Sequence, residues 1–386
     1  MPEPLLSVRD LVVTFRTPAG VLTAIDGVSF DVFPGEVLCI VGESGSGKSV
    51  LNLAIMGLLP PNAKIESGQV LYRGEDIAEA TPKRMRELRG SRIAMVFQDP
   101  MTALNPVRRV GRQIGEMIRL HDKASTAASR KERAIDLLRE VGVPDAEARY
   151  DAYPHQFSGG MRQRATIAMA MANRPALLIA DEPTTALDVT IQAQVMDVLS
   201  EVRAEVGSSM ILVTHDLGLV AEAADRVAVM YSGRLVETGT VDEIFHEASH
   251  PYTIGLLRSL LRTDSTTDVA YAIPGQPPTL ATRPSGCAFQ PRCAIGRDRP
   301  ECGAVVPPLV RLADPVVGAP AAPTSTAGDD DGHFGAPTVF GLSDADHLAA
   351  CLFADEAEAL LAEADARTTA TAGSGDPVLS PSRSTP

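Results

Sequence analysis

Aromatic residues are scarce in this chain: tryptophan is absent, and Phe, Tyr and Trp together make up 4% of the 386 residues. No apolar run reaches the roughly 18 residues that a membrane-spanning helix needs, and the first residues lack the basic-then-apolar layout of a secretory signal. Basic residues are in the minority, because 35 Lys and Arg stand against 49 Asp and Glu, for a net charge of −14. Nucleic-acid binders normally show a basic surface. These absences predict a soluble, cytoplasmic protein with no nucleic-acid partner.

Cysteine is also rare, with five residues placed unevenly along the chain. Cys39 lies inside an early apolar segment and is predicted to be a small core residue. The other four come late, at Cys287, Cys293, Cys302 and Cys351. This distribution differs from the dense cysteine framework of a small secreted disulfide protein.

The composition changes near residue 303. Residues 303–386 contain 12 acidic and 3 basic side chains, so much of the negative charge lies there. The stretch 303–338 is rich in Pro, Ala, Gly and Asp and is predicted to be a loop. Residues 366–386 are rich in Thr, Ser, Gly and Pro and are predicted to form a disordered tail.

Before residue 303 the pattern is that of an α/β protein. Val28, Phe30 and Val32 alternate with polar or small residues, as in a half-buried strand. Short, nearly continuous apolar segments are typical of buried parallel strands, and helical patterns follow them. The strands are expected at 37–41, 176–180 and 210–213, and the helices at about 48–58, 191–206 and 217–223. The repeated strand, turn and helix predict a mainly parallel sheet covered by helices.

A phosphate-binding motif occupies the first of these turns. Residues 42–49 read Gly-Glu-Ser-Gly-Ser-Gly-Lys-Ser and fit the pattern G-x-x-x-x-G-K-[S/T] between a strand and a helix. The glycines let backbone N–H groups converge on phosphate oxygens, and the helix N-terminus adds positive potential. Lys48 would neutralise the β- and γ-phosphates, and the Ser49 hydroxyl would ligate Mg²⁺. The alternative is a chance glycine-rich turn, which the flanking strand and helix argue against.

A second motif ends in two consecutive carboxylates. Residues 177–182 read Leu-Leu-Ile-Ala-Asp-Glu, so an apolar strand leads into Asp181 and Glu182. Asp181 would hold the metal through water, and Glu182 would act as general base on the attacking water. The alternative is a solvated acidic strand end.

A third motif precedes a helix that is predicted to run to about residue 173. Residues 157–163 read Phe-Ser-Gly-Gly-Met-Arg-Gln. Ser158 is a suitable N-cap, and the N–H groups of Gly159 and Gly160 at the positive helix end would suit a γ-phosphate. Taken alone, the motif is only a flexible helix start.

The order and spacing of these motifs over about residues 6–247 resemble ATP-binding cassette (ABC) ATPases. The resemblance extends to Gln98 as the Q-loop, to Ala186-Leu187-Asp188 as the D-loop and to His215 as the switch histidine. Two positions depart from the usual signature, Phe157 in place of Leu and Met161 in place of Gln. The resemblance implies a RecA-like core with an antiparallel β subdomain over residues 1–97 and 155–247, and a helical subdomain over 98–154.

The resemblance also implies roles for individual residues. Two such domains pair head to tail, and each ATP lies between one phosphate loop and the partner's signature. Phe15 would stack on adenine, although an aromatic at that position could equally be a core residue. The phosphates would be bound by Ser44, Gly45, Ser46, Gly47, Lys48, Ser49 and Val50. Magnesium would be held by Ser49, Gln98 and Asp181. Catalysis would involve Glu182, His215, Lys48 and Gln98. The partner's nucleotide would be contacted by Ser158, Gly159 and Gly160, with Asp188 in the D-loop. For His215 the alternative is a helix-capping or hydrogen-bonded strand-end residue.

Four segments resemble a subgroup of this family, the oligopeptide, dipeptide and nickel importers, and in particular their D-type ATP-binding subunits. They are residues 98–106 (QDPMTALNP) and, in the C-terminal part, 250–253 (HPYT), 273–278 (IPGQPP) and 287–293 (CAFQPRC). A C-terminal extension is therefore expected over 248–302 and 339–365. Residues 99–109, and Leu104 within them, are expected to receive a permease helix, or else to form an ordinary loop.

The subgroup implies an ATPase that powers peptide import, a translocase at the cytoplasmic face of the cell membrane. Its partners would be a second, related ATPase subunit, two transmembrane permeases and an extracytoplasmic solute-binding protein. Two other functions are open to a chain with these motifs. One is a non-transport ABC ATPase of DNA repair or translation, although such proteins usually carry two cassettes or basic arms. The other is a redox-sensing ATPase.

The four late cysteines are candidate metal ligands. Four thiolates can hold tetrahedral zinc or an iron–sulfur cluster. The wide, irregular spacing, without a C-x₂-C pair, favours a cluster, and the importer subgroup is similar in having C-terminal cysteines suited to [4Fe–4S]. We expect Cys287, Cys293, Cys302 and Cys351 to converge on a [4Fe–4S] cluster, with zinc or ordinary thiols as alternatives.

Overall fold

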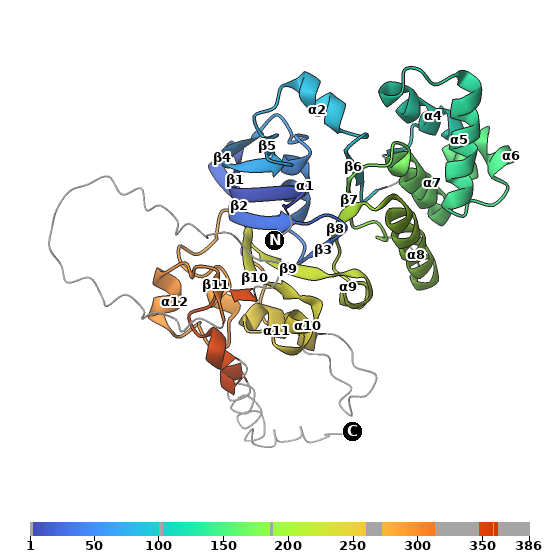
Figure 1. The fold of residues 1–386 in the computed structure, drawn as a ribbon. Coiled ribbons are helices and arrows are strands. Elements are labelled where there is room, and N and C mark those ends of the chain that lie inside the picture. The colour runs from blue at the N-terminus through green and yellow to red at the C-terminus, as the bar shows by residue number, and fades with distance from the viewer. Residues whose placement is uncertain are drawn as a thin grey trace, which may run out of the picture.

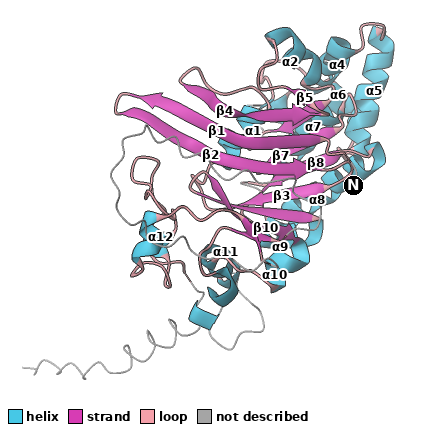
Figure 2. Ribbon diagram, turned by 60° about the vertical axis from the view of Figure 1, so that its left-hand side comes forward, coloured by secondary structure: helices cyan, strands magenta, loops and turns pink. Residues whose placement is uncertain are grey.

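The computed structural model describes residues 3–99, 103–185, 188–259, 272–312, 347–357 and 359–361. Its strands form two sheets, and its helices gather mainly at one end and along one side of them (Figures 1 and 2). The α/β class and the mainly parallel sheet predicted from the sequence are confirmed. No helix among the described residues is both long and apolar enough to cross a bilayer.

The smaller sheet is antiparallel and has the strand order β2-β1-β4-β5. Its strands are β1 (Leu6–Thr17), β2 (Gly20–Val32), β4 (Ala63–Tyr72) and β5 (Glu75–Asp76). Strands β1 and β2 form a long hairpin in which Phe15 lies opposite Leu22. The predicted alternating strand at residues 28–32 is the second half of β2.

The larger sheet has eight strands in the order β11-β12-β10-β9-β3-β8-β7-β6. Five of them run parallel to their neighbours: β3 (Val37–Val41), β6 (Ile93–Val96), β7 (Leu177–Asp181), β8 (Ser209–Val213) and β9 (Arg226–Tyr231). The antiparallel remainder is β10 (Arg234–Thr240), β11 (Val310–Arg311) and β12 (Leu348–Ala349). Strands β3, β7 and β8 are buried along their whole length, which explains their uninterrupted apolar sequences.

The helices agree closely with the sequence pattern. Helix α9 (Leu217–Ala223) has the predicted bounds, and α8 (Val189–Val206) begins two residues early behind an Asp188 N-cap. Helix α1 (Lys48–Ile55) ends before Gly57, whose φ of 60° leaves the right-handed helix region. The others are α2 (Pro82–Leu88), α4 (Val110–His121), α5 (Ala127–Glu140), α6 (Ala146–Tyr150), α7 (Gly159–Met171), α10 (Val241–His246), α11 (Pro251–Arg258) and α12 (Pro300–Ala304), with 3₁₀ turns at Pro154–Gln156, Gln290–Arg292 and Ala354–Glu356.

Two hydrophobic cores lie on opposite faces of the larger sheet. Cys39 points into the core shared with α4, α5, α7 and α8, where it is fully buried as predicted. Its neighbours Leu38 and Ile40 point into the other core, which includes β1, β2 and α1. The loop that follows β3 is therefore fixed from both faces of the sheet.

The C-terminal part of the chain joins the larger sheet. Strand β12 pairs with β10 through Glu237 and Ala349. The buried Glu237 carboxylate accepts hydrogen bonds from the backbone N–H groups of Ser249 (2.7 Å) and His250 (3.0 Å), and lies 2.9 Å from His347 Nε2. The start of the predicted 303–338 loop is instead the end of α12 and strand β11. Residues 313–338 of that loop, and the predicted tail 366–386, lie outside the described residues.

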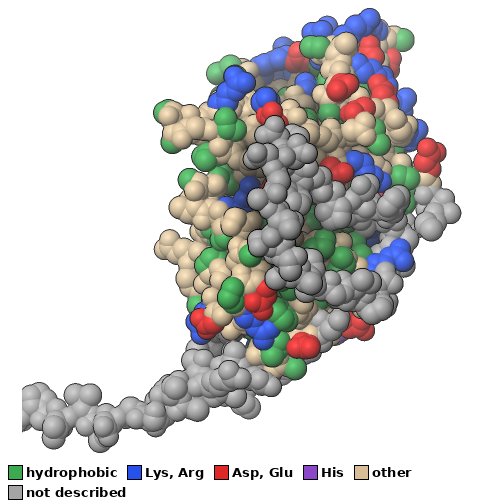
Figure 3. All heavy atoms as spheres, turned by 90° about the vertical axis from the view of Figure 1, so that its left-hand side faces the viewer, with side chains coloured by type: hydrophobic (Ala, Val, Ile, Leu, Met, Phe, Trp, Pro, Cys, Tyr) green, Lys and Arg blue, Asp and Glu red, His purple; other side chains and the backbone are tan. Residues whose placement is uncertain are grey.

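On the face seen in Figure 3, acidic and basic side chains are interspersed along the upper edge. Hydrophobic side chains are scattered singly between them, as on an ordinary globular surface.

Candidate active site

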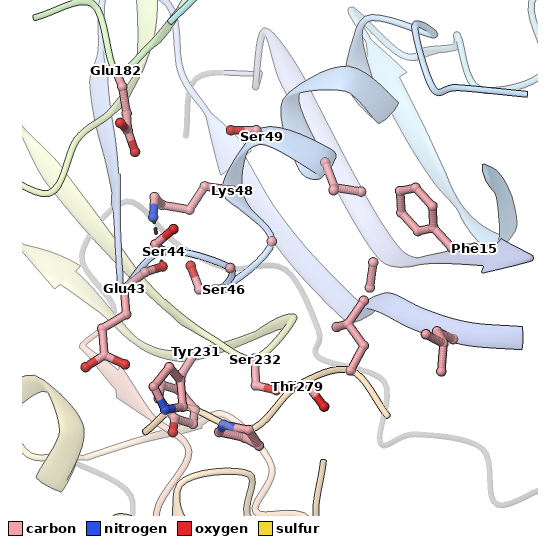
Figure 4. A pocket seen from close by; sticks show the side chains of 18 of the residues that line it. Phe15, Glu43, Ser44, Ser46, Lys48, Ser49, Glu182, Tyr231, Ser232 and Thr279 are labelled. Carbon is pink, nitrogen blue, oxygen red and sulfur yellow. Dashed lines mark hydrogen bonds between the residues drawn. The ribbon is translucent and has the colours of Figure 1, made fainter. Parts of the chain in front are cut away.

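A pocket of about 690 Å³ opens at the carboxyl end of β3. Because β3, β8 and β7 are parallel neighbours, the loops that follow them meet at one edge of the sheet, where α/β proteins bind ligands. The pocket is lined by residues from the first 50 positions and by residues from later parts of the chain (Figure 4). Its lining residues are Phe15, Thr17, Leu22, Ala24, Glu43, Ser44, Gly45, Ser46, Gly47, Lys48, Ser49, Val50, Gln98, Glu182, Tyr231, Ser232, Pro277, Pro278, Thr279 and Leu280.

The loop of residues 42–49, called the P-loop below, requires its glycines. Gly42 has a φ of 151°, and a Cβ there would lie 2.1 Å from the backbone oxygen of Met230. Gly47 has a φ of 111°, and a Cβ would lie 2.9 Å from Ile25 Cδ1 and from Met230 Cε. Neither position admits a side chain without moving the core, so the loop backbone is held in a shape that suits phosphate.

Polar groups in the P-loop are available for a ligand. The Lys48 Nζ donates hydrogen bonds to the backbone oxygens of Gly42 (2.7 Å) and Glu43 (3.1 Å), within its own loop. Burial lowers the pKa of Lys48, while the charges of Glu182, Asp181 and Glu43 oppose that shift. The Ser46 hydroxyl is buried without a hydrogen-bond partner within the described chain. Buried polar atoms normally have a partner, and a phosphate oxygen would supply one here.

A hydroxyl and a carboxylate meet beside Lys48. Ser49 Oγ donates a hydrogen bond of 3.3 Å to Asp181 Oδ1. Burial is the main cause that raises the pKa of Asp181; the Ser49 hydrogen bond opposes it, and the neighbouring Glu182 charge adds to it. Oxygen donors of this kind are what Mg²⁺ prefers, so the pair fits the metal that accompanies a nucleotide.

Glu182 is the common partner of three other side chains. Its Oε2 accepts hydrogen bonds from Gln98 Nε2 (2.8 Å) and Thr185 Oγ1 (2.9 Å), and His215 Nδ1 lies 3.8 Å away. Glu182 has a φ of 46°, a left-handed conformation that is uncommon for residues other than glycine and often marks functional positions. The His215 side chain is 67% exposed, so it is free to approach a bound ligand.

Phe15 lies at the end of the pocket away from Glu182, across from Thr279 (Figure 4). Its strand partner Leu22 lines the same end. The flat apolar ring of Phe15 faces the pocket, and its role as the adenine platform stays a prediction. Residues 277–280, from the C-terminal part of the chain, complete this end.

The signature and the D-loop lie elsewhere. Ser158 is the N-cap of α7 and accepts a hydrogen bond from the Met161 N–H. Asp188 caps α8 by accepting from the Ile191 N–H at 3.0 Å, while Ala186 and Leu187 lie outside the described residues. Neither Ser158 nor the glycines that follow it line the pocket. They are therefore not part of the site formed by their own chain.

In the expected permease-docking segment, the prediction for Leu104 is wrong. Leu104 is 2% exposed and packs in the core with α4 and α5, so it cannot present itself to a partner. Among the described residues of the segment, Val107 is a large apolar side chain that is 78% exposed. Residues 100–102 of the segment lie outside the described residues.

The structure brings the four late cysteines together. Cys287, Cys293, Cys302 and Cys351 line one small cavity of about 20 Å³. Burial is the main cause that raises the pKa of each thiol, to about 11 for Cys302 and about 12 for Cys351. All four are free thiols. In the described part of the chain, no group of three or more His, Cys, Asp or Glu side chains is arranged to hold a metal ion. Four thiols are suitable ligands for a cluster, but the cavity between them has room for only about one water molecule.

A P-loop that faces two carboxylates across one sheet edge defines the class, a nucleotide-binding P-loop protein. The family model of ABC transporters matches residues 25–185, and the model of the C-terminal region of oligopeptide/dipeptide transporters matches residues 236–302. The chain belongs to the family of ABC transporter ATP-binding proteins.

Two relatives from Bacillus subtilis illustrate the likeness. The dipeptide transport ATP-binding protein DppD is 53% identical over 292 residues, which cover 75% of this chain and 87% of the relative. The oligopeptide transport ATP-binding protein OppD is 53% identical over 287 residues, which cover 74% and 80%.

Solved structures give the same answer for the cassette. A dimer of the ATP-binding cassette MJ0796 in a post-hydrolysis state, bound to ADP and Pi, matches 61% of this chain and 98% of its own, with a TM-score of 0.56 and 25% identity. The protein CbiO1 of Clostridium perfringens, part of an ABC transporter complex, matches 64% and 92%, with a TM-score of 0.54 and 30% identity.

Sequence reasoning missed the contribution of the C-terminal part of the chain to the pocket. Tyr231 ends β9 and Ser232 follows it, and residues 277–280 come from the IPGQPP segment and the two residues after it. The resemblance of that segment to importer extensions was visible in the sequence. Its place beside the nucleotide pocket was not, because no spacing rule relates it to the P-loop.

Proposed function

We propose that this chain is the ATP-hydrolysing subunit of a transporter that imports peptides across the cell membrane. The observation that carries the proposal is the union, in one chain, of the cassette match at residues 25–185 and the peptide-transporter match at 236–302. The match to relatives named for dipeptide and oligopeptide transport covers most of the length of those relatives.

The proposed chemistry follows from the residues around the pocket. Lys48 and the P-loop N–H groups bind the β- and γ-phosphates, and Phe15 stacks on the base. Ser49 and Asp181, with Gln98, would hold Mg²⁺, which would neutralise phosphate charge. Glu182 takes the proton of the attacking water. Gln98 and His215 hold that carboxylate and the water in place.

A second cassette completes the site in this proposal. Ser158, Gly159 and Gly160 of one subunit contact the nucleotide held by the P-loop of the other, and Asp188 lies at that interface. Two facts support the pairing: the signature does not line the pocket of its own chain, and the MJ0796 cassette was solved as a dimer. We propose that the partner is a different, related ATPase, that two permeases carry the membrane spans, and that a solute-binding protein delivers the peptide.

We propose the following division of the chain. The cassette core with its β subdomain occupies residues 1–97 and 155–247, and the helical subdomain occupies 98–154. The cysteine-containing extension occupies 248–302 and 339–365. The whole subunit lies at the cytoplasmic face of the membrane as a peripheral component.

The direct test of the assignment is co-purification. The tagged chain is extracted in detergent from cells that also express the permease genes found beside the gene for this chain. Recovery of two multi-spanning permeases and a second ATPase supports the proposal. Recovery of nucleic-acid-processing proteins in their place would favour the non-transport alternative.

Val107 tests the docking surface. We propose that residues 99–109 receive a permease helix, and Val107→Asp places a charge on the exposed apolar side chain of that segment. We expect permease recovery or peptide uptake to fall about tenfold, as for an interface residue of central importance. The control is Val21→Asp, which makes the same change at another exposed valine (64%) on the β1–β2 hairpin. Equal recovery and uptake for both variants would contradict docking at this segment.

We further propose that the four late cysteines bind a [4Fe–4S] cluster. The support is the gathering of four thiols, two buried and two half-buried, from three segments around one cavity. Binding would displace the thiol protons and open the cavity, so ligation is coupled to the folding of this region.

The cluster has a direct chemical test. Protein purified without oxygen is expected to be brown, to absorb broadly at about 400 nm and to contain about four irons per chain. Cys351→Ser should lower the iron content, whereas Cys39→Ala, which changes a core cysteine that does not line the cavity, should not. Stoichiometric zinc without iron would replace the cluster with a zinc site, and neither metal would leave four ordinary thiols.

A further inference from the structure

The second residue of the P-loop is held by the C-terminal part of the chain. The Glu43 side chain points away from Lys48 (Figure 4). Its carboxylate accepts two hydrogen bonds from Arg292, from Nη1 to Oε2 (2.6 Å) and from Nη2 to Oε1 (3.0 Å). This bidentate pair is the strong form of a carboxylate–arginine contact. It joins residues 249 positions apart in the sequence.

Arg292 is fixed before it reaches Glu43. Its side chain is 5% exposed. Nε donates to the backbone oxygen of Pro274 at 3.0 Å, and Nη1 also donates to Tyr231 Oη at 3.3 Å. The guanidinium lies about 6 Å from the ring centres of Tyr231 and Phe289. With these contacts the arginine loses little further freedom when it pairs with Glu43.

A second element holds the backbone of the same residue. The Glu43 N–H donates a hydrogen bond of 2.8 Å to Tyr252 Oη. Tyr252 is fully buried at the start of α11, where the His250 Nδ1 accepts from its N–H at 3.1 Å. Burial lowers the pKa of His250 to about 4, so the ring is neutral and can accept at neutral pH.

The two segments therefore converge on one point. The rings of Tyr231, Tyr252 and Phe289 pack together with centre distances of 4.6–5.4 Å, and so join 250–253 to 287–293. The nucleotide pocket is lined, together with Glu43, by Tyr231, Ser232 and residues 277–280 of the extension. Two of the segments that the sequence singled out, 250–253 and 287–293, therefore contact the P-loop at Glu43.

We propose that Arg292 is a positioning residue for ATP binding: it neutralises Glu43 and, with Tyr252, holds the P-loop in its phosphate-binding shape. Without Arg292, an unpaired carboxylate would lie in the loop that binds a triphosphate. The loop would also lose its side-chain contact with the extension and keep the Tyr252 hydrogen bond to its backbone. This role concerns nucleotide affinity and does not depend on the imported cargo.

The test compares two arginines of the same region. Arg292→Ala is expected to weaken binding of a fluorescent ATP analogue by the full chain about tenfold. It should raise the KM for ATP by a similar factor and leave kcat at saturating ATP within about twofold, because Glu182 and His215 are unchanged. Arg299→Ala is the control, since the Arg299 guanidinium stacks 4.0 Å over Phe353 and does not contact the P-loop. That variant should bind ATP like the parent.

Two further variants make the outcome decisive. Adding Glu43→Gln to Arg292→Ala removes the unpaired charge and should recover part of the lost affinity. Arg292→Lys keeps the charge but not the bidentate contact, and should bind with intermediate affinity. An unchanged affinity in Arg292→Ala, with only a lower melting temperature, would overturn the proposal. If Arg292→Ala does not fold, parental affinity in Arg292→Lys would overturn it.

Discussion

Glu182→Gln is expected to lower ATP turnover by the assembled transporter about 10²–10⁴-fold, the usual contribution of a general base. ATP affinity should stay close to the parental value, because the P-loop, Ser49 and Asp181 are unchanged. Glutamine has nearly the same shape and can still contact Gln98 and Thr185, which hold the carboxylate in the parent. Steady-state hydrolysis and equilibrium ATP binding, measured on the same preparation, separate the two effects.

The control is Glu222→Gln, which removes the same charge from an exposed position on α9. Its turnover should equal that of the parent. Parental turnover in Glu182→Gln would remove Glu182 from the role of base, and His215 or another group would have to take it. A large loss of ATP affinity in Glu182→Gln would show that the carboxylate supports binding instead.

Lys48→Ala is expected to weaken ATP binding about 10- to 100-fold, the loss of hydrogen bonds to a charged group. In the structure Lys48 is buried and donates to two oxygens of its own loop, so its ammonium group already lies where the phosphates are expected. The substitution also removes the positive charge that faces Asp181 and Glu182. Calorimetric titration with ATP measures the effect.

Lys83→Ala, at an exposed position of α2, is the matched control and should bind ATP like the parent. Because Lys48 is buried, thermal unfolding without nucleotide should accompany the titration. Parental affinity in a folded Lys48→Ala chain would contradict the assignment of the P-loop.

The parts of the fold that could be predicted are those that local sequence determines. Residues 37–41 are buried on both faces, so their apolar run was sufficient to place β3 with its bounds. Positions 42 and 47 require glycine because a Cβ there would clash with neighbouring atoms. The glycines of the motif therefore predicted the P-loop from sequence alone. The carboxylates of Asp181 and Glu182 follow another buried strand, and parallel pairing alone brings them to the same edge.

The parts that could not be predicted depend on contacts between distant segments. Leu104 was expected to face a permease, but α4 and α5 cover it, and no periodicity in so short a segment distinguishes an inner from an outer leucine. The pairing of Glu43 with Arg292 joins positions 249 apart, and the sequence contains no signal for it. The convergence of Cys351 with the other cysteines was expected only because a metal site was assumed.

Peptide uptake by reconstituted vesicles tests the central claim most directly. The chain is assembled with its permeases and second ATPase. ATP is enclosed in the vesicles on the side of the ATPase subunits, and a labelled peptide is added outside with the solute-binding protein. We predict uptake that requires ATP and is lost when this chain carries Glu182→Gln, while the complex still assembles and binds ATP. Uptake at the parental rate with the Glu182→Gln chain, or an intact complex that hydrolyses ATP without moving any peptide, would contradict the account.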